Sequence, residues 1–181
     1  MKQIEFPYVY HSHTERCGHA FGKDEDIVLA AIQHGVKVLC ITDHTPIPGH
    51  SQPGIRMELD QLDEYVETWQ KLKEKYKDRI EIHIGLEAEY SSEHNDYLKD
   101  FVLNKGIEYI ICGEHLYEID GKLVWANAKS YGEHTRTKKD LMDTYIQQVC
   151  EGMNKGFIKY FAHPDFFINS QDIRIIIVDK H

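Results

Sequence analysis

The 181-residue chain is long enough for one globular domain, and its composition, 41% hydrophobic and 28% charged, is typical of soluble globular proteins. The formal net charge of −9 argues against a nucleic-acid partner, because such binding relies on Lys and Arg. No run approaches the roughly 18 apolar residues of a membrane span, and the four cysteines have no Cys-x-x-Cys spacing. We therefore expect a reduced, cytoplasmic setting without a membrane partner, and a homo-oligomer stays open.

The first expected strand, residues 8–10, runs directly into a stretch rich in histidine. His11 and His13 are two positions apart, so in a strand their side chains point to the same face. Two imidazoles side by side at the end of a strand can bind one divalent metal ion. His19 follows in a glycine-containing turn, close enough for the same site or a neighbouring one. Cys17 lies among these histidines, either as a soft ligand or as a packed thiol.

A helix and a second strand follow this stretch. The expected helix begins at Lys23-Asp24-Glu25-Asp26, whose three carboxylates suit a helix N-terminus, and ends at Gly35. The apolar run 36–42 predicts a buried strand that ends in Asp43 and His44, with Asp43 a candidate for orienting neighbouring histidine rings. A strand, a helix and a strand within about 30 residues form a βαβ unit, which indicates a parallel sheet.

A long loop over residues 45–57 is a candidate functional segment. Its Arg56 is a candidate for binding an anionic group of a substrate. The next expected helix, residues 59–76, has an apolar stripe that we assign to core packing: Leu62, Tyr65, Val66, Trp69, Leu72 and Tyr76.

The rest of the chain continues the alternation of strands and helices. Strands are expected over residues 80–90, 109–112 and 157–161, helices over 95–104 and 140–154, and a long aromatic loop over 116–139. The ends of the five expected strands carry metal-ligand residues: His11 and His13, His44, Glu87, His115 and His163. In a parallel βα barrel these ends open on one face, where active sites are built.

These residues predict a metal centre. Imidazole and carboxylate ligands without thiolates suit Zn, Mn or Fe(II), and the set is large enough for two to three divalent ions, with Glu87 bridging two of them. Multi-metal sites favour phosphoryl chemistry, in which one ion activates water and the others bind phosphate oxygens. No Gly-x-Ser-x-Gly sequence or phosphate-binding glycine-rich loop is present, so a serine hydrolase and a nucleotide-driven kinase or ATPase are not expected.

Six motifs, in order, resemble the polymerase and histidinol phosphatase (PHP) superfamily. They are His11-Ser12-His13, His19, Ile41-Thr42-Asp43-His44, Gly85-Leu86-Glu87, Glu114-His115 and Ala162-His163-Pro164-Asp165. Two segments, Arg16-Cys17-Gly18-His19-Ala20 and Gly85-Leu86-Glu87-Ala88-Glu89-Tyr90, are most similar to its histidinol-phosphate phosphatase branch. The resemblance covers about residues 8–169 of an expected single domain, 1–181, whose residues 170–181 form an atypical C-terminal end.

The resemblance implies an α/β fold, a distorted (β/α)7-type barrel that is incomplete here, with about five βα units. It implies a trinuclear centre in which His11, His13 and Glu87 hold the first ion. Glu87, His115 and His163 would hold the second ion, and His19 and His44 the third. The residues carried over as catalytic are His11, His13, Glu87, His115 and His163, while Arg56 would help to select a small phosphorylated substrate.

The function implied by the resemblance is metal-dependent hydrolysis of a phosphomonoester by metal-bound hydroxide. The expected reaction converts L-histidinol phosphate and water into L-histidinol and phosphate, in histidine biosynthesis. The alternatives are another phosphoesterase of the superfamily, a phosphotyrosine phosphatase or a nuclease-like enzyme, and a truncated remnant that binds metal without turnover.

The C-terminal end departs from the pattern of the superfamily. A late Asp-x-His motif normally completes the first and third sites far beyond the Ala-His-Pro-Asp motif, but here the chain ends soon after it. Its last residues, Asp179-Lys180-His181, have that form. They either supply the missing ligands or resemble them by accident, and the seven residues 166–172 are short for a crossover to another parallel strand.

Overall fold

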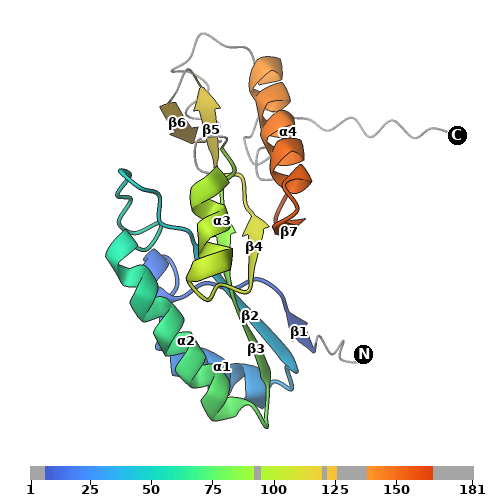
Figure 1. Ribbon diagram of the computed structural model, residues 1–181. Coiled ribbons are helices and arrows are strands. Elements are labelled where there is room, and N and C mark those ends of the chain that lie inside the picture. Colours follow the sequence, from blue (N-terminus) through green and yellow to red (C-terminus); the bar gives the residue numbers. More distant parts are fainter. Residues whose placement is uncertain (1–6, 92–94, 120–121, 126–137, 165–181) are drawn as a thin grey trace, which may run out of the picture.

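The computed structural model describes residues 7–91, 95–119, 122–125 and 138–164. Its main sheet has five parallel strands in the order β1-β2-β3-β4-β7 (Figure 1). The strands are β1 (Tyr8–Val9), β2 (Val38–His44), β3 (Glu81–Ala88), β4 (Tyr109–Cys112) and β7 (Ile158–Phe161). The helices between them are α1 (Asp24–Gln33), α2 (Leu62–Tyr76), α3 (Asn95–Asn104) and α4 (Lys138–Asn154).

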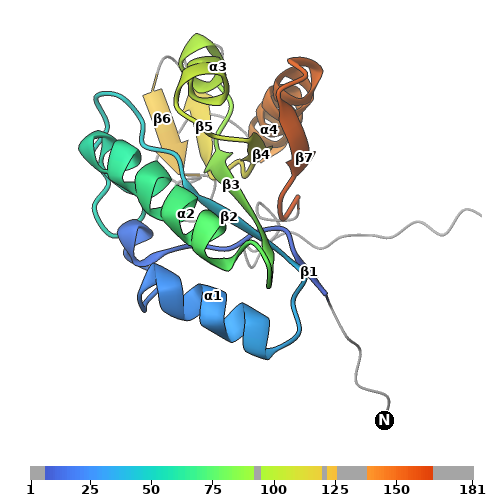
Figure 2. The ribbon, with the colours of Figure 1, turned by 60° about the horizontal axis from the view of Figure 1, so that its bottom comes forward.

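The sheet curls so that its two edge strands approach each other. Helices α1 to α4 form an arc around the outside of the curled sheet, which Figure 2 shows from below. The hydroxyl of Tyr160, in β7, donates a hydrogen bond of 2.5 Å to the backbone oxygen of Tyr10, directly after β1. The expected α/β fold, an incomplete barrel of about five βα units, is therefore confirmed.

The prediction of a loop over residues 116–139 is wrong in part. Residues 116–119 and 122–125, expected within a loop over 116–139, form the antiparallel strands β5 (Leu116–Ile119) and β6 (Lys122–Trp125). The sequence between them, Asp120-Gly121, is a common hairpin signal, and the flanking runs are rich in β-forming residues. The aromatic composition of the segment therefore obscured a local turn signal, and residues 126–137 of that loop lie outside the described residues.

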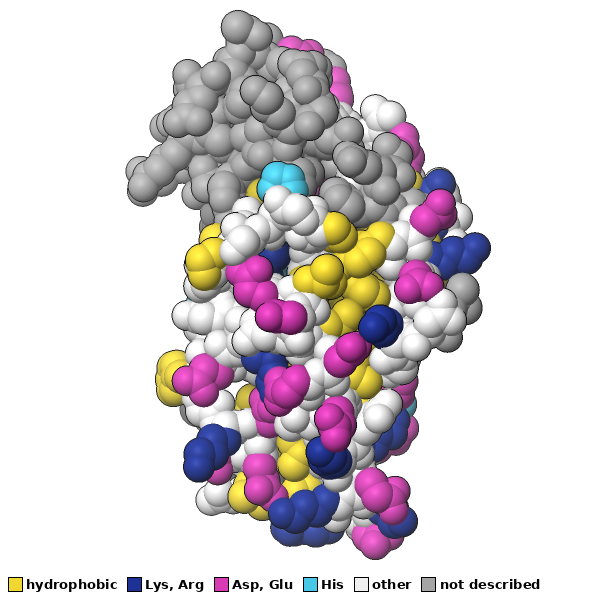
Figure 3. Space-filling model, turned by 60° about the vertical axis from the view of Figure 1, so that its left-hand side comes forward, with side chains coloured by type: hydrophobic (Ala, Val, Ile, Leu, Met, Phe, Trp, Pro, Cys, Tyr) yellow, Lys and Arg dark blue, Asp and Glu magenta, His cyan; other side chains and the backbone are white. Residues whose placement is uncertain are grey.

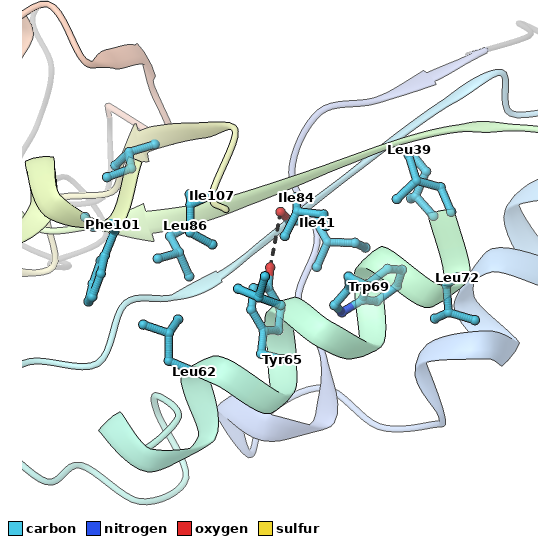
Figure 4. Packing of buried hydrophobic residues seen from close by; sticks show 14 of the residues in the cluster. Leu39, Ile41, Leu62, Tyr65, Trp69, Leu72, Ile84, Leu86, Phe101 and Ile107 are labelled. Atoms are coloured by element: carbon cyan, nitrogen blue, oxygen red, sulfur yellow. Dashed lines mark hydrogen bonds between the residues drawn. The ribbon is translucent and has the colours of Figure 1, made fainter. Parts of the chain in front are cut away.

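Helix α2 packs on the sheet through the apolar stripe that the sequence predicts. All six residues of the stripe are buried, and Figure 4 shows four of them, Leu62, Tyr65, Trp69 and Leu72, against β2 and β3. The hydroxyl of Tyr65 donates a 2.8 Å hydrogen bond to the backbone oxygen of Gly85. It also lies 3.4 Å from the backbone oxygen of Ile41, the contact that is dashed in Figure 4. This packing holds β3 in place and with it the residues at the C-terminal end of β3.

Replacing Trp69 by alanine is expected to lower the free energy of unfolding by about 3–5 kcal/mol, because the indole is fully buried and its removal leaves a cavity. Urea unfolding followed by circular dichroism measures the change. Trp69→Phe is the control and should lose less, because it keeps most of the apolar volume. Equal losses for the two variants would contradict this account of the core.

The surface carries both signs of charge. Figure 3 shows acidic and basic side chains mixed over the described part of one face, with hydrophobic side chains among them. No helix in the described part of the chain is long and apolar enough to cross a membrane.

Candidate metal centre

The C-terminal ends of the parallel strands bring the predicted metal ligands to one edge of the sheet. His44, the last residue of β2, lies beside Glu87 of β3 in the strand register. His115 comes three residues after the end of β4, and His163 two residues after the end of β7. Parallel pairing therefore places residues far apart in sequence around a single point.

The carboxylate of Glu87 lies at that point and is fully buried. One of its oxygens, Oε1, is 2.7 Å from Nε2 of His163 and also faces two other imidazoles. Its other oxygen, Oε2, faces two more. Oε1 is 3.6 Å from Nε2 of His115 and 3.7 Å from Nε2 of His11. Oε2 is 3.2 Å from Nδ1 of His44 and 3.4 Å from Nε2 of His13. Five imidazoles thus surround one carboxylate.

His11 and His13 reach this carboxylate from beyond β1 rather than from within a strand. β1 ends at Val9, one residue earlier than expected. Ser12 then bonds to β2 through its side chain as well as its backbone. The Ser12 hydroxyl donates a hydrogen bond to the backbone oxygen of Cys40, and the backbone N–H of Thr42 donates one to the backbone oxygen of Ser12. Nδ1 of His11 lies 2.6 Å from the Thr42 hydroxyl, which directs Nε2 of His11 toward Glu87.

His19 lies at the open side of the cluster and is exposed. Its ring centre is 5.0 Å from that of His13 and 5.1 Å from that of His44. Nδ1 of His19 is 3.1 Å from the backbone oxygen of Cys17, and its Nε2 is 3.6 Å from the Cys17 sulfur. All seven predicted ligands, His11, His13, His19, His44, Glu87, His115 and His163, therefore fall in one contiguous cluster.

Gly113 provides the space that Glu87 occupies. A Cβ atom at Gly113 would lie 1.9 Å from Oε1 of Glu87 and 2.6 Å from its Cδ, well inside van der Waals contact. The sequence interpretation took this glycine only as the residue after a strand. The structure shows that its missing side chain admits the central carboxylate.

Two members of the cluster, His44 and Glu87, have protonation states that suit metal binding. Burial lowers the pKa of His44 to about 3, so its imidazole is neutral. Burial alone would raise the pKa of Glu87, but the hydrogen bond from His163 and the surrounding imidazoles lower it to about 2. Neutral imidazoles and an ionised carboxylate are the forms in which these side chains bind metals. Although burial alone would lower the pKa of His13, hydrogen bonds with Asp43 and Cys17 outweigh it and raise that pKa to about 10, so an ion bound there would displace its proton.

Buried polar atoms without hydrogen-bond partners give a second test of whether these residues fit a divalent metal ion. Among the described residues, Nδ1 of His13, Nδ1 of His44 and Oε2 of Glu87 are buried without a hydrogen-bond partner. Leaving buried polar atoms unpaired is costly, and an ion between Nδ1 of His44 and Oε2 of Glu87, which are 3.2 Å apart, would satisfy both atoms, whereas Nδ1 of His13 faces Asp43. The residues present therefore fit a bound divalent metal.

Within the part of the chain that the structure describes, three groups of residues have ligand atoms within 4.8 Å of one another: His11, His13 and Glu87; His44, Glu87 and His115; and His13, Cys17 and His19. The first has the same members as the first ligand set implied by the resemblance. The second has His44 where the implied second set has His163. Glu87 belongs to two groups, as a bridging carboxylate would.

Other candidate residues lie around the cluster or outside the described part. Asp43 accepts hydrogen bonds from the backbone N–H and the hydroxyl of Thr14, and its Oδ1 is 3.4 Å from Nδ1 of His13. Arg56 is buried, with its guanidinium bonded to protein groups, and substrate binding by Arg56 stays a prediction. Asp179 and His181 lie outside the described residues, as does Asp165.

Two carboxylates beside the cluster, Glu89 and Glu114, fall within the motifs of the sequence but have no predicted role. Glu89 lies 3.0 Å from Nδ1 of His115, and Glu114 is fully buried. Burial, together with the nearby charge of Glu89, raises the pKa of Glu114 well above its ordinary range. The two-residue spacing of Glu87 and Glu89 was the available signal for Glu89, since it places both on one side of an extended chain.

Known proteins resemble this chain in both sequence and fold. A probable histidinol-phosphatase of Schizosaccharomyces pombe is 34% identical over 173 residues, 87% of this chain and 50% of that protein. One of Deinococcus radiodurans is 32% identical over 105 residues, 58% of this chain and 40% of that protein. The chain thus spans about half the length of these relatives or less.

The fold resembles that of a crystallised enzyme. The histidinol phosphate phosphatase of Lactococcus lactis, solved as a complex with zinc, L-histidinol and phosphate, matches with a TM-score of 0.71 and 23% identity. The match covers 91% of this chain and 60% of that one. The family model described as the PHP domain matches residues 10–177. Because the PHP domain model matches nearly the whole of this chain, and the histidine cluster lies at the strand ends, the chain belongs to the PHP domain family.

Proposed function

We propose that this chain is a metal-dependent phosphomonoester hydrolase that acts on L-histidinol phosphate. The observation that carries the proposal is the fully buried Glu87 carboxylate with five imidazoles, each having a nitrogen within 3.7 Å of it. The sequence relatives named histidinol-phosphatase support the choice of substrate. The solved relative with zinc, L-histidinol and phosphate supports the choice of metal and ligand class.

The proposed ligands for two to three Zn, Mn or Fe ions are His11, His13, His19, His44, Glu87, His115 and His163. Divalent ions bound there would supply Lewis acidity toward phosphate oxygens and activate a water molecule. Glu87 would bridge two ions and offset their positive charge, because its two oxygens face different imidazoles. The Thr42 hydroxyl would hold the ring of His11 through Nδ1 and leave Nε2 for the metal.

Phosphate release tests the proposal. Protein expressed with Mn, Fe and Zn available, and with its metal content measured, is incubated with L-histidinol phosphate and separately with phosphotyrosine, and the released phosphate is measured. Incubation with single-stranded DNA is followed by gel electrophoresis, because cleavage of a phosphodiester releases no free phosphate. Release of phosphate from L-histidinol phosphate at the highest kcat/KM, abolished by a chelator, is the expected result. Faster hydrolysis of another substrate would assign a different phosphoesterase activity, and no release from fully metal-loaded protein would reject the proposal.

A pair of histidine variants adds a matched control. His115→Gln removes a proposed ligand and should lose activity. His83→Gln alters a partly exposed histidine whose ring nitrogens lie within hydrogen-bonding distance of Glu81 and Glu108, and this variant should keep its activity. Equal activity in both variants would contradict the proposed site.

A further inference from the structure

A buried ion pair lies directly behind His115. The guanidinium of Arg56 donates to both carboxylate oxygens of Glu89, with Nη1 to Oε2 and Nη2 to Oε1 each at 3.0 Å. Arg56 is 2% exposed and Glu89 is 8% exposed. Two parallel bonds of this kind fix the orientation of both side chains.

The remaining donors of Arg56 bind the loop that carries it. Nη1 also donates to the backbone oxygen of Thr45 at 2.8 Å, and Nε donates to the Gln52 side-chain oxygen at 2.6 Å. Every nitrogen of the guanidinium thus has a protein acceptor. This arrangement suits a role inside the protein better than contact with a substrate anion.

Glu89 in turn holds the ring of His115. Oε1 of Glu89 is 3.0 Å from Nδ1 of His115, and Nε2 of the same ring is 3.6 Å from Oε1 of Glu87. Both oxygens of Glu89 accept hydrogen bonds from the Arg56 guanidinium, the geometry of a carboxylate paired with arginine. An ionised carboxylate only accepts hydrogen bonds, so the ring proton lies on Nδ1 and the lone pair on Nε2.

We propose that Glu89 and Arg56 are positioning residues for the metal centre. Glu89 sets the tautomer and the ring orientation of His115, so that Nε2 is presented to the ion shared with Glu87. Arg56 fixes the position and orientation of Glu89 through two hydrogen bonds, and acts on the centre only through Glu89. The inference rests on the proposed metal-binding function and gives Arg56 a different role from substrate binding.

The alternative is a purely structural pair that ties the 45–57 loop to the end of β3. The two roles differ in what they would change. A structural role predicts lower stability and unchanged metal affinity per folded molecule, whereas a positioning role predicts selective weakening of the ion bound through His115. Partners that orient metal-bound histidines typically contribute about 10- to 100-fold in metal affinity.

Three variants of the full chain separate the roles: Glu89→Gln, Arg56→Met and the double variant. Metal affinity is measured by competition with a chromophoric zinc chelator, and bound ions are counted by elemental analysis. We expect each variant to bind one ion about 10- to 100-fold more weakly, with the other ions retained. The double variant should lose no more than Glu89→Gln alone, because Arg56 acts through the Glu89 charge.

A core variant controls for stability. Leu72→Ala opens a cavity in the core under α2, away from His115, and should lower stability while leaving all metal affinities unchanged. Unchanged metal affinity in Glu89→Gln would overturn the proposal. A further loss in the double variant beyond Glu89→Gln would overturn the claim that Arg56 acts only through Glu89. A rise in KM alone in Arg56→Met would instead assign Arg56 to the substrate.

The tautomer of His115 gives a readout that does not depend on activity. Long-range proton–nitrogen NMR spectra of the metal-free protein should show His115 protonated at Nδ1, with this preference reduced in Arg56→Met and in Glu89→Gln. Protonation at Nε2 in the unmodified protein would reject the positioning role. This result also separates the inference from the proposed function, because a chain that binds no metal would still show the Nδ1 tautomer.

Discussion

Replacing Glu87 by glutamine is expected to remove bound metal from the centre and to lower phosphate release by about 1,000-fold or more, because the ions contribute several kcal/mol to the transition state. Glutamine keeps the volume of the side chain but loses the negative charge and one of the two oxygens. The five imidazoles around it would then face a neutral amide whose NH2 group cannot bind a metal. Elemental analysis and a phosphate-release assay measure the two effects.

The matched control for this variant is Glu81→Gln. Glu81 begins the same strand, β3, but is exposed and contacts His83. The Glu81→Gln variant should bind metal and release phosphate like the unmodified protein. If Glu87→Gln kept the full number of ions at unchanged affinity, the centre would not be organised around Glu87.

Replacing Gly113 by alanine is expected to lower activity by about 100-fold and to weaken metal binding, since a displacement of about 1 Å at a reacting centre can have that effect. The new methyl group would overlap Oε1 of Glu87. Glu87 is fully buried and bonded to His163, so its carboxylate cannot move aside without leaving the imidazoles. Metal affinity and kcat/KM are the measurements.

Two further variants test the cause of this loss. Gly35→Ala adds the same methyl group at a left-handed position, φ +78°, that has open space around it. It should lower stability by about 1–2 kcal/mol through backbone strain and leave metal binding intact. Adding Glu87→Asp to Gly113→Ala withdraws the carboxylate and should restore part of the metal affinity, whereas no recovery would point to a cause other than the overlap with Glu87.

Local patterns in the sequence were sufficient for most of the fold. The apolar stripe of α2 and the β-forming runs at β2, β3, β4 and β7 depend on spacing within one segment, and that spacing survives in the structure. The hairpin of β5 and β6 was also predictable from Asp120-Gly121 and its flanking runs. It was missed because the segment was judged by its aromatic residues rather than by its turn signal.

The ligand cluster was predictable because parallel strands all end at one edge of a sheet, so a histidine or a carboxylate after each strand implies a shared site. The contacts that link Arg56 to Glu89 and Glu89 to His115 were not predictable from the sequence. Arg56 and Glu89 are 33 positions apart, and Glu89 and His115 are 26 apart. No periodicity links such positions. The sequence by itself determined which residues stand at the strand ends. Only the tertiary structure decided which of them meet, that Arg56 faces Glu89, and that Gly113 makes room for Glu87, because these contacts depend on how the sheet curls and the 45–57 loop folds back.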